Sequence, residues 1–331
     1  MLKKPKILVV GSYVMDLIAS APRVPNMGET VIGTDFRTAP GGKGANQAVQ
    51  CARLGASVTM AGRVGDDAFG REMLETAKAS GVDVSRTLIT PNCPTGVGNI
   101  QLEVTESGTQ NRILVVPGAN YAVKIEDLEW LEAEVKNYDL VMLQLELPME
   151  VTCYVAKIAH TAGVPVMLNP APAAELSDEL ISCLSYLSPN EHEAALLTGQ
   201  TIGAEDGADM NDLEKVCQIL RDKGAKKVIV TLGGNGSSIC GEEGIQLTEC
   251  VRMPEVKDPT AAGDSFVAAF CTGITAGLTE KEALAFASHT AAITVSRMGA
   301  MPSLPFISDV QALMVERCYN GFDPAVLDAL K

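Results

Sequence analysis

An acidic residue in the first turn of a predicted helix is the clearest chemical feature of the chain. Residues 258–266 read Asp-Pro-Thr-Ala-Ala-Gly-Asp-Ser-Phe, follow a strand-like segment and open an apolar-periodic helix. The small side chains of Ala261, Ala262 and Gly263 leave the first-turn amides uncovered, so this helix start is suited to bind an anion such as phosphate. A carboxylate beside a phosphate makes sense if it takes a proton from the attacking group, so Asp264 is a candidate general base. A first-turn Asp can also simply favour the helix dipole, and this segment alone leaves both interpretations open.

A glycine-rich turn near the N-terminus supplies a second candidate site. Residues 41–46 read Gly-Gly-Lys-Gly-Ala-Asn and precede a predicted helix that ends at Gly55. The glycines allow a ligand to approach the backbone, while Lys43 and Asn46 offer donors for hydroxyl or phosphate oxygens. The spacing is not that of a P-loop, and Gly11-Ser12-Tyr13-Val14 breaks the dinucleotide-binding fingerprint.

These two segments together resemble the signatures of the ribokinase family of carbohydrate kinases. That family has Gly-Gly-x-Gly-x-Asn near the N-terminus and Ala/Gly-Ala-Gly-Asp near the C-terminus. The resemblance extends from Lys6 to about Pro305. Four further segments agree with it in order: Gln144-Leu145-Glu146, Leu168-Asn169-Pro170-Ala171-Pro172-Ala173, Ser188-Pro189-Asn190-Glu191-His192-Glu193 and Thr231-Leu232-Gly233.

The resemblance implies a role for each matching residue. It makes Asp264 the general base, with the backbone amides of Ala261, Ala262 and Gly263 as the anion hole. The implied sugar contacts are Val14, Asp16, Gly42, Lys43, Asn46, Glu146 and Asp264. The implied ATP contacts are Asn190, Thr231, Leu232, Gly233, Gly234, Asn235, Gly236, Gly263 and Ser288.

Two cation sites are also implied. Asn190 and Glu193 match an Asn-x-x-Glu element that helps to organise Mg²⁺, although both residue types are ordinary in the first turn of a helix. A monovalent cation, K⁺, is expected beside the anion hole. Its implied ligands are Asp258, the Thr260 carbonyl, backbone around Thr294, Arg297 and Gly299, and Ser303.

Composition and charge narrow the class of protein. The 331 residues are 47% apolar, which is typical of a globular enzyme large enough to bury a substantial core. The net charge of −15 argues against nucleic acid or an anionic membrane as a partner. No stretch approaches the roughly 20 apolar residues of a membrane span, and we expect a cytoplasmic protein.

Cysteine and histidine spacing gives no metal or disulfide pattern. The nine cysteines form no Cys-x-x-Cys pair, and several lie on apolar helix faces, as Cys217 does between Val216 and Leu220. Reduced thiols in a cytosolic core are therefore expected. The three histidines are scattered, so zinc is not expected.

The elements that must position these residues alternate along the chain. Strand-like runs at 6–11, 58–62, 139–143, 165–168, 185–188 and 227–232 are separated by helical stretches, among them 70–80, 150–162 and 212–223. This alternation predicts a three-layer α/β/α fold with a mostly parallel sheet, the architecture that the resemblance also implies. Asp16, Asn169, Asn190, Gly233 and Asp258 each follow a predicted strand. Each alone is an ordinary turn residue, but the carboxyl edge of such a sheet is where ligands bind.

Two regions break the alternation. Residues 14–40 and 94–117 have short extended runs and few helical faces, and the sequence alone predicts antiparallel strands added to the main sheet. The resemblance implies that they form a β-sheet lid through which the chain dimerises. The expected division is a catalytic core of 1–13, 41–93 and 118–331, with an inserted lid that is not independent.

The expected activity is ATP-dependent phosphorylation of the primary 5-hydroxyl of D-ribose. Three alternatives remain open. Val14 stands where many family members have Asn, which would leave a sugar hydroxyl unpaired at a cost of about 1–3 kcal/mol and would favour 2-deoxyribose. The second alternative is phosphorylation of another acceptor, such as fructose or a nucleoside. A nucleoside pocket generally needs aromatic or apolar surface to stack the base, and only 4% of the chain is aromatic. The third is a non-catalytic sugar-binding regulator, which would not need Asp264, Asn190 and Glu193 together.

Overall fold

A nine-stranded sheet forms the centre of the molecule in this computed structural model, which describes residues 2–105, 108–203 and 209–331. The strand order is β13-β12-β11-β10-β9-β8-β1-β4-β5, and every pairing is parallel except β11 with β12 and β12 with β13. The strands are β1 (Lys6–Val10), β4 (Ser57–Gly65), β5 (Val82–Thr90), β8 (Leu140–Leu143), β9 (Val166–Leu168), β10 (Tyr186–Leu187), β11 (Lys227–Thr231), β12 (Ser237–Gly241) and β13 (Gly244–Thr248).

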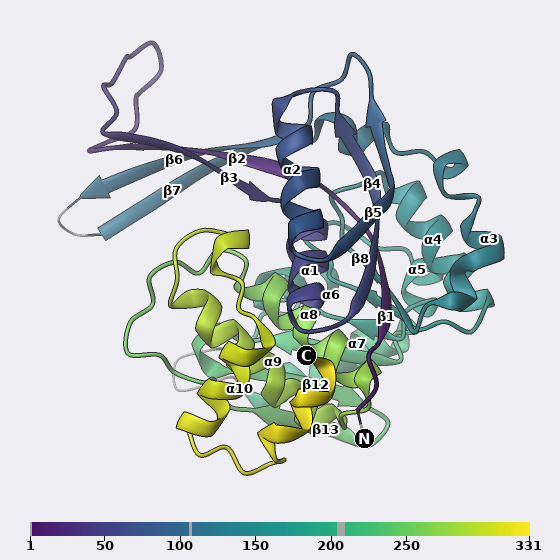
Figure 1. Cartoon of the computed structure of the whole chain (residues 1–331). Coiled ribbons are helices and arrows are strands. Elements are labelled where there is room, and N and C mark those ends of the chain that lie inside the picture. Colours follow the sequence, from purple (N-terminus) through teal and green to yellow (C-terminus); the bar gives the residue numbers. More distant parts are fainter. Residues whose placement is uncertain (1, 106–107, 204–208) are drawn as a thin grey trace.

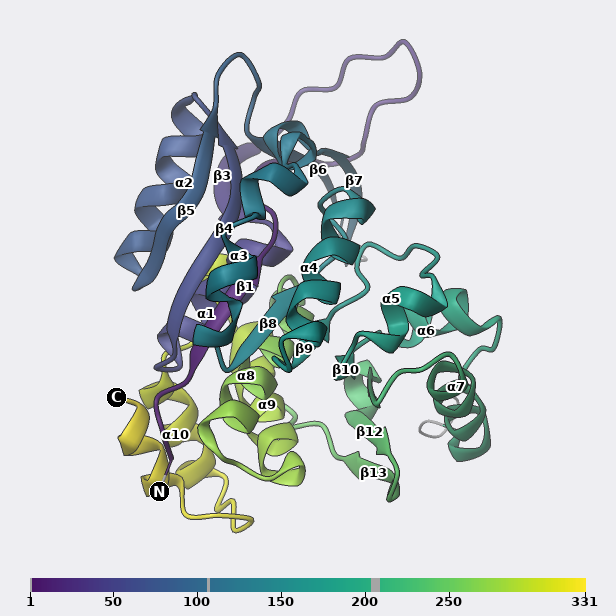
Figure 2. The same ribbon diagram turned by 90° about the vertical axis from the view of Figure 1, so that its right-hand side faces the viewer.

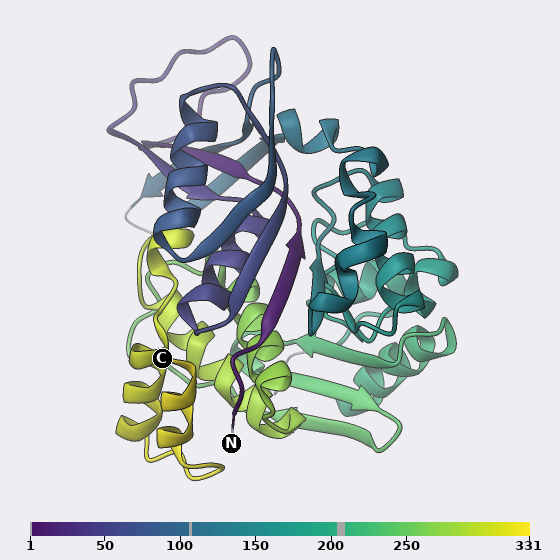
Figure 3. The same cartoon turned by 45° about the vertical axis from the view of Figure 1, so that its right-hand side comes forward.

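Helices cover both faces of this sheet (Figure 3). One layer contains α1 (Lys43–Arg53), α2 (Ala68–Ala79), α8 (Ala262–Ala276), α9 (Glu280–Val295) and α10 (Ile307–Glu316). The other contains α3 (Leu131–Glu134), α4 (Met149–Thr161), α5 (Asp178–Ser182), α6 (Glu191–Thr198) and α7 (Met210–Asp222). Short 3₁₀ helices are η1 (Gly118–Ala122), η2 (Ile125–Leu128), η3 (Val135–Asn137), η4 (Gly233–Asn235), η5 (Met301–Ser303) and η6 (Pro324–Leu330).

Strand β1 shows why both layers are needed. Its alternate side chains Ile7 and Val9 enter one hydrophobic core, while Leu8 and Val10 enter the other, and all four are buried. Because a strand buried on both faces needs apolar residues at every position, its sequence is continuously apolar. The expected three-layer fold with a mostly parallel sheet is confirmed. Edge strands β5 and β13, whose exposure varies along the strand, were not predicted.

A separate four-stranded sheet projects from the body (Figures 1 and 2). Its order is β3-β2-β6-β7, and β2 pairs with β6 in parallel while the outer pairings are antiparallel. Its strands are β2 (Val14–Ala21), β3 (Asp35–Gly41), β6 (Gly96–Thr105) and β7 (Gly108–Val116). The prediction that these regions extend the main sheet was therefore wrong. At the junction, the buried Asn120 side chain accepts from the Tyr13 amide and donates to the Tyr13 and Pro117 carbonyls.

The segment before α8 also differs from its prediction. The segment that precedes residue 258 was expected to be strand-like, but residues 251–257 run as a loop. The amides of Lys257 and Asp258 both donate to the Val295 carbonyl at the end of α9, so the helix end takes the place of a neighbouring strand. Asp258 thus follows a loop, and Asp16 lies within β2 and not beyond β1, whereas Asn169 and Gly233 do follow strands closely. No described helix is long and apolar enough to cross a membrane.

Candidate active site

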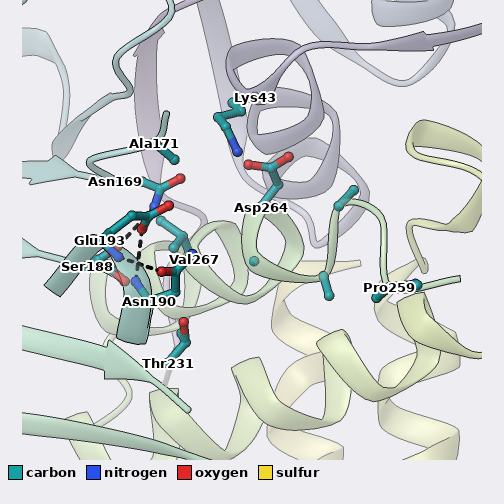
Figure 4. A pocket seen from close by; sticks show the side chains of 13 residues that line it. Lys43, Asn169, Ala171, Ser188, Asn190, Glu193, Thr231, Pro259, Asp264 and Val267 are labelled. Carbon is teal, nitrogen blue, oxygen red and sulfur yellow. Dashed lines mark hydrogen bonds between the residues drawn. The ribbon is translucent and has the colours of Figure 1, made fainter. Parts of the chain in front are cut away.

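A cavity of about 220 Å³ opens beside the carboxyl ends of the parallel strands. It brings together residues from α1, the ends of β9, β10 and β11, the start of α6 and the first turn of α8. Its walls are formed by Lys43, Asn169, Ala171, Ser188, Asn190, Glu193, Thr231, Pro259, Ala261, Ala262, Gly263, Asp264 and Val267 (Figure 4). Eight of these are candidates from the sequence, drawn from segments more than 200 residues apart.

The first turn of α8 presents free backbone amides to this cavity. The residue before the helix, Ala261, has a φ of 61° and makes no side-chain cap. The first-turn amides of a helix have no partner within the helix and must find one outside it. Among the described residues, no backbone carbonyl outside α8 accepts from the amides of Gly263 and Asp264. A Cβ built on Gly263 would meet no described atom within 4 Å. This turn can therefore receive an anion directly on its backbone.

Asp264 is buried in that turn and is held by two amide side chains of α1. Only 6% of Asp264 is exposed. Asn46 Nδ2 donates to Asp264 Oδ2 at 2.8 Å, and Gln47 Nε2 donates to Asp264 Oδ1 at 3.0 Å. The Asn46 Oδ1 atom is buried and has no partner, so it is available to accept a hydrogen bond from a ligand. The general-base candidate and a sugar-contact candidate therefore form one unit.

Lys43 supplies positive charge at the same place. Its ammonium group points toward the Asp264 carboxylate (Figure 4). Burial by itself would lower the pKa of Lys43, but the carboxylates of Asp264, Glu146 and Glu193 outweigh it and the pKa is raised. A protonated Lys43 faces three carboxylates, so the cavity has no surplus of positive side chains with which to hold a nucleoside triphosphate.

Glu146 fixes the glycine-rich turn that begins α1. One oxygen, Oε2, accepts from the Lys43 amide at 2.9 Å and also from the Ser12 hydroxyl. Burial raises the pKa of Glu146, against the effect of these hydrogen bonds. Gly42 has a φ of 88°, and a Cβ there would lie 2.7 Å from the Val14 amide nitrogen. A side chain at position 42 would therefore push the small sheet away from α1.

Asp16 lies between two glycines of the small sheet. A Cβ on Gly41 would come within 2.8 Å of Asp16 Oδ2, and one on Gly98 within 2.6 Å of Oδ1. Burial, together with Glu146, Asp264 and Asp258, raises the pKa of Asp16 to about 7. Val14 is 4% exposed, and its Cγ1 is 3.7 Å from the Cβ position of Gly98, so it packs under β6.

Asn190 and Glu193 form a reciprocal cap at the start of α6. Asn190 Oδ1 accepts from the Glu193 amide at 2.8 Å, and Glu193 Oε2 accepts from the Asn190 amide at 2.9 Å. One atom of each, Asn190 Nδ2 and Glu193 Oε1, has no hydrogen bond to the described protein. Burial raises the pKa of Glu193 even though the Asn190 amide opposes that effect.

The candidate nucleotide loop follows β11. Thr231 lines the cavity, Leu232 is buried, and the Cβ positions of Gly233 and Gly234 are open. Asn235 is exposed at the end of η4, and Gly236 has a φ of 92°, where a Cβ would lie 2.1 Å from the Thr248 carbonyl oxygen. Gly236 is thus needed to turn the chain into β12. Ser288 is buried within α9 and does not line the cavity.

The candidate K⁺ ligands surround the loop between α9 and α10. Asp258 Oδ1 accepts from the Thr260 amide and Oδ2 from the Gly299 amide, both at 2.9 Å. The side chain of Arg297 turns away to Asp309 at 3.1 Å, which leaves only its backbone for a cation. The hydroxyls of Thr294 and Ser303 are engaged with Ser265 and with the Ala300 carbonyl.

One residue of the site, Gln47, was missed at the level of sequence, although it donates to Asp264. Asn169, predicted at the ligand-binding edge of the sheet, and Ser188, which lies in a matching segment but was given no role, both line the cavity. Gln47 directly follows Asn46 in the glycine-rich segment, which is the one sequence signal that could have identified it. Its contact with Asp264 spans 217 positions, so no local pattern predicts it.

Comparisons with known proteins agree on one family. Residues 4–307 match the model of the pfkB family carbohydrate kinases. A ribokinase of Schizosaccharomyces pombe is 41% identical over 311 residues, covering 92% of this chain and 96% of its own. A ribokinase of Lactococcus lactis is 36% identical over 312 residues, covering 94% and 97%. The solved structure of Arabidopsis thaliana ribokinase complexed with ribose and ATP has a TM-score of 0.85 at 32% identity, covering 94% of this chain and 99% of that one.

Proposed function

We infer that this chain, which belongs to the pfkB family of carbohydrate kinases, catalyses the ATP-dependent phosphorylation of ribose. One observation carries the chemistry: a buried carboxylate, Asp264, stands in the same helical turn as free backbone amides and opposite Lys43. A protein that only bound sugar would have no need of a carboxylate placed against an anion-binding turn. The alternative of a non-catalytic regulator is therefore not favoured.

The transfer proceeds by attack of a primary sugar hydroxyl on the γ-phosphorus. Asp264 takes the hydroxyl proton, the new O–P bond forms, and the bond to the bridging oxygen breaks so that ADP leaves with its electron pair. The amides of Gly263 and Asp264 stabilise charge on the transferring phosphoryl oxygens. The amide side chains of Asn46 and Gln47 donate to both oxygens of the buried carboxylate and so fix its orientation before attack.

Cations supply the charge that the protein lacks. The cavity offers Lys43 against Asp264, Glu146 and Glu193, so the triphosphate needs Mg²⁺, which commonly uses one carboxylate and several waters. Glu193 Oε1 would accept a hydrogen bond from a water of that hydrated ion, and Asn190 Nδ2 would donate to a phosphate oxygen beside it. K⁺ at Asp258 would hold the Thr260 turn against the Gly299 loop, and Asp258→Ala should abolish any acceleration by K⁺. Equal rates of the unmodified protein with and without K⁺ would refute this monovalent site.

The sugar binds where the small sheet meets α1. Asp16, Glu146 and Asn46 offer the acceptors, and Gly41 and Gly98 leave room for the Asp16 carboxylate between them. Because the pKa of Asp16 is raised to about 7, its carboxylate is lost as the pH falls through 7. The KM for ribose should therefore rise below about pH 7, whereas the KM for ATP should not follow it. Parallel changes in both constants would contradict this assignment.

A test of acceptor identity separates the remaining alternatives. ADP release should be measured with ribose, 2-deoxyribose, fructose and a nucleoside, and ribose should give the highest kcat/KM. Val14 packs against β6, which favours ribose over 2-deoxyribose because no hydroxyl needs to face it. Val14→Asn should then leave the ratio of the two pentoses unchanged. A shift toward ribose by about 1–3 kcal/mol would show that Val14 faces the differing hydroxyl.

The protein is proposed to be a cytoplasmic homodimer that pairs through the small sheet. Support for pairing comes from exposed apolar side chains on β7, where Ile113, Leu114, Val115 and Val116 are each at least 45% exposed. All nine cysteines are free thiols, which fits a reducing compartment. Sedimentation of the native protein and of Leu114→Lys tests the dimer, and a monomer in both would contradict it.

A further inference from the structure

A chain of buried amide side chains leads from the main sheet to Asp264. Gln47 is fully buried and does not line the cavity. Its Nε2 donates to Asp264 Oδ1 at 3.0 Å and to Asn169 Oδ1 at 3.3 Å, and its Oε1 accepts from Gln144 Nε2 at 2.6 Å. Asn169 in turn donates to the Ser188 carbonyl at 3.0 Å. Every polar atom of the Gln47 side chain is therefore used.

The direction of these hydrogen bonds is fixed at both ends. The Ser188 carbonyl can only accept, so Asn169 must turn its amide nitrogen to it and present its oxygen to Gln47. Asp264 as a carboxylate also can only accept. Gln47 must consequently direct its nitrogen at both acceptors and its oxygen at Gln144, because the flipped amide would place oxygen against oxygen at two sites.

We propose that Gln47 is a positioning residue for the general base: its amide donates to Asp264 Oδ1 and so holds the carboxylate in the orientation needed by the attacking hydroxyl. This inference rests on the proposed role of Asp264. Asn46 binds the other oxygen but also has a free Oδ1 for the sugar, so its side chain is shared between base and substrate. Gln47 has no such second task, and its anchors lie at the rigid ends of β8, β9 and β10.

The charges around Asp264 explain why its carboxylate needs a fixed hydrogen-bond donor. Lys43 from α1 favours the ionised base, whereas Asp16 from β2, Glu146 after β8 and Glu193 from α6 all disfavour it by repulsion. Three like charges and burial thus oppose one cation. Loss of the Gln47 donor would remove a hydrogen bond that favours the charged form of a carboxyl group.

The experiment compares Gln47→Met with Gln50→Met. Gln50 is a matched control because it is also fully buried in α1, one turn further on, but donates to the Pro305 carbonyl and not to the base. Rates should be measured at saturating ribose and ATP, so that protonation of Asp16 in the free protein does not contribute. Gln47→Met should lower kcat about 10- to 100-fold with both KM values within about threefold, and should move the acidic limb of the kcat profile up by about one pH unit.

Gln50→Met should keep kcat within about threefold and leave that limb in place. A folded Gln47→Met with unchanged kcat, an unmoved acidic limb, or an equal loss in both variants would overturn the proposal. Should Gln47→Met not fold, Gln47→Glu keeps the side-chain shape and the acceptor for Gln144. Its kcat must then fall below that of the unmodified protein by at least the range expected for Gln47→Met, because it adds a like charge beside Asp264. Asp264→Asn is measured in parallel to distinguish failure of the proposed base from failure of its proposed positioning. If Asp264→Asn stays active, Asp264 is not the base.

Discussion

Helices α6 and α8 begin at the same cavity, and their first turns are built in opposite ways. At α6, the side chains of Asn190 and Glu193 cap each other's backbone amides. At α8, Ala261 has a left-handed φ of 61° and no side-chain cap, and the amides of Gly263 and Asp264 have no backbone partner outside the helix among the described residues. The α6 turn is thus complete without a ligand, whereas the α8 turn is left for one.

On the proposed function, the two helix starts would contact phosphate in different ways. The α8 turn offers direct backbone contacts, which cost no reorganisation when charge develops on the transferring group. The α6 turn offers one spare atom from each capping side chain, enough to orient a hydrated ion but not to hold a phosphate by itself. Changes at α8 should therefore affect the chemical step, and changes at α6 the dependence on Mg²⁺.

The largest effect is expected from Asp264→Asn. An amide cannot accept the hydroxyl proton, so kcat should fall about 10²–10⁴-fold. ADP binding, measured by calorimetry, should stay within a few fold because the backbone amides of the turn remain. Near-normal turnover would show that Asp264 is not the base, and that the first turn of α8 has no special role in the chemical step compared with that of α6.

Gly263→Ala should give the next largest effect. A methyl group there meets no described atom, so the fold should be kept, and the helix should gain up to about 1 kcal/mol in propensity. The same methyl stands at the wall of the cavity where phosphoryl oxygens must approach the amides. We expect kcat to fall about tenfold while the melting temperature stays level or rises; an unchanged kcat would place the phosphoryl group elsewhere.

Glu193→Gln isolates the role of α6. A glutamine oxygen can still accept from the Asn190 amide, so the reciprocal cap survives and only the charge is lost. The Mg²⁺ concentration for half-maximal rate should rise about tenfold, with kcat at saturating Mg²⁺ little changed. An unaltered Mg²⁺ titration would make Glu193 a purely structural residue.

Ala261→Gly should have the smallest effect. A left-handed alanine costs about 1–2 kcal/mol, and glycine relieves this but loses about 0.5–1 kcal/mol of chain entropy on folding. The free energy of unfolding, measured in urea, should increase by about 0.5–1 kcal/mol. A decrease would mean that the Ala261 methyl makes packing contacts worth more than the strain.

The sequence alone determined the α/β class and the main residues of the site. Continuous apolar strands such as β1 can be recognised without a structure, because burial on both faces demands apolar residues at each position. The glycine-rich and small-residue segments pointed to Lys43 and Asp264 as candidates, because backbone turns near phosphate require such residues at fixed spacing. Asn190 and Glu193 became candidates through the Asn-x-x-Glu resemblance.

Only the tertiary structure decided what these residues contact. The 251–257 segment has strand-like composition, yet its backbone is satisfied by the end of α9, which no local pattern encodes. The regions 14–40 and 94–117 form their own sheet because β2 pairs with β6, and Asn120 ties the junction through a contact 107 positions away. Gln47 reaches Asp264 across 217 positions in the same way. Local sequence fixes side-chain chemistry and backbone preference, but hydrogen bonds between distant segments exist only once the layers have packed, and those bonds orient the base.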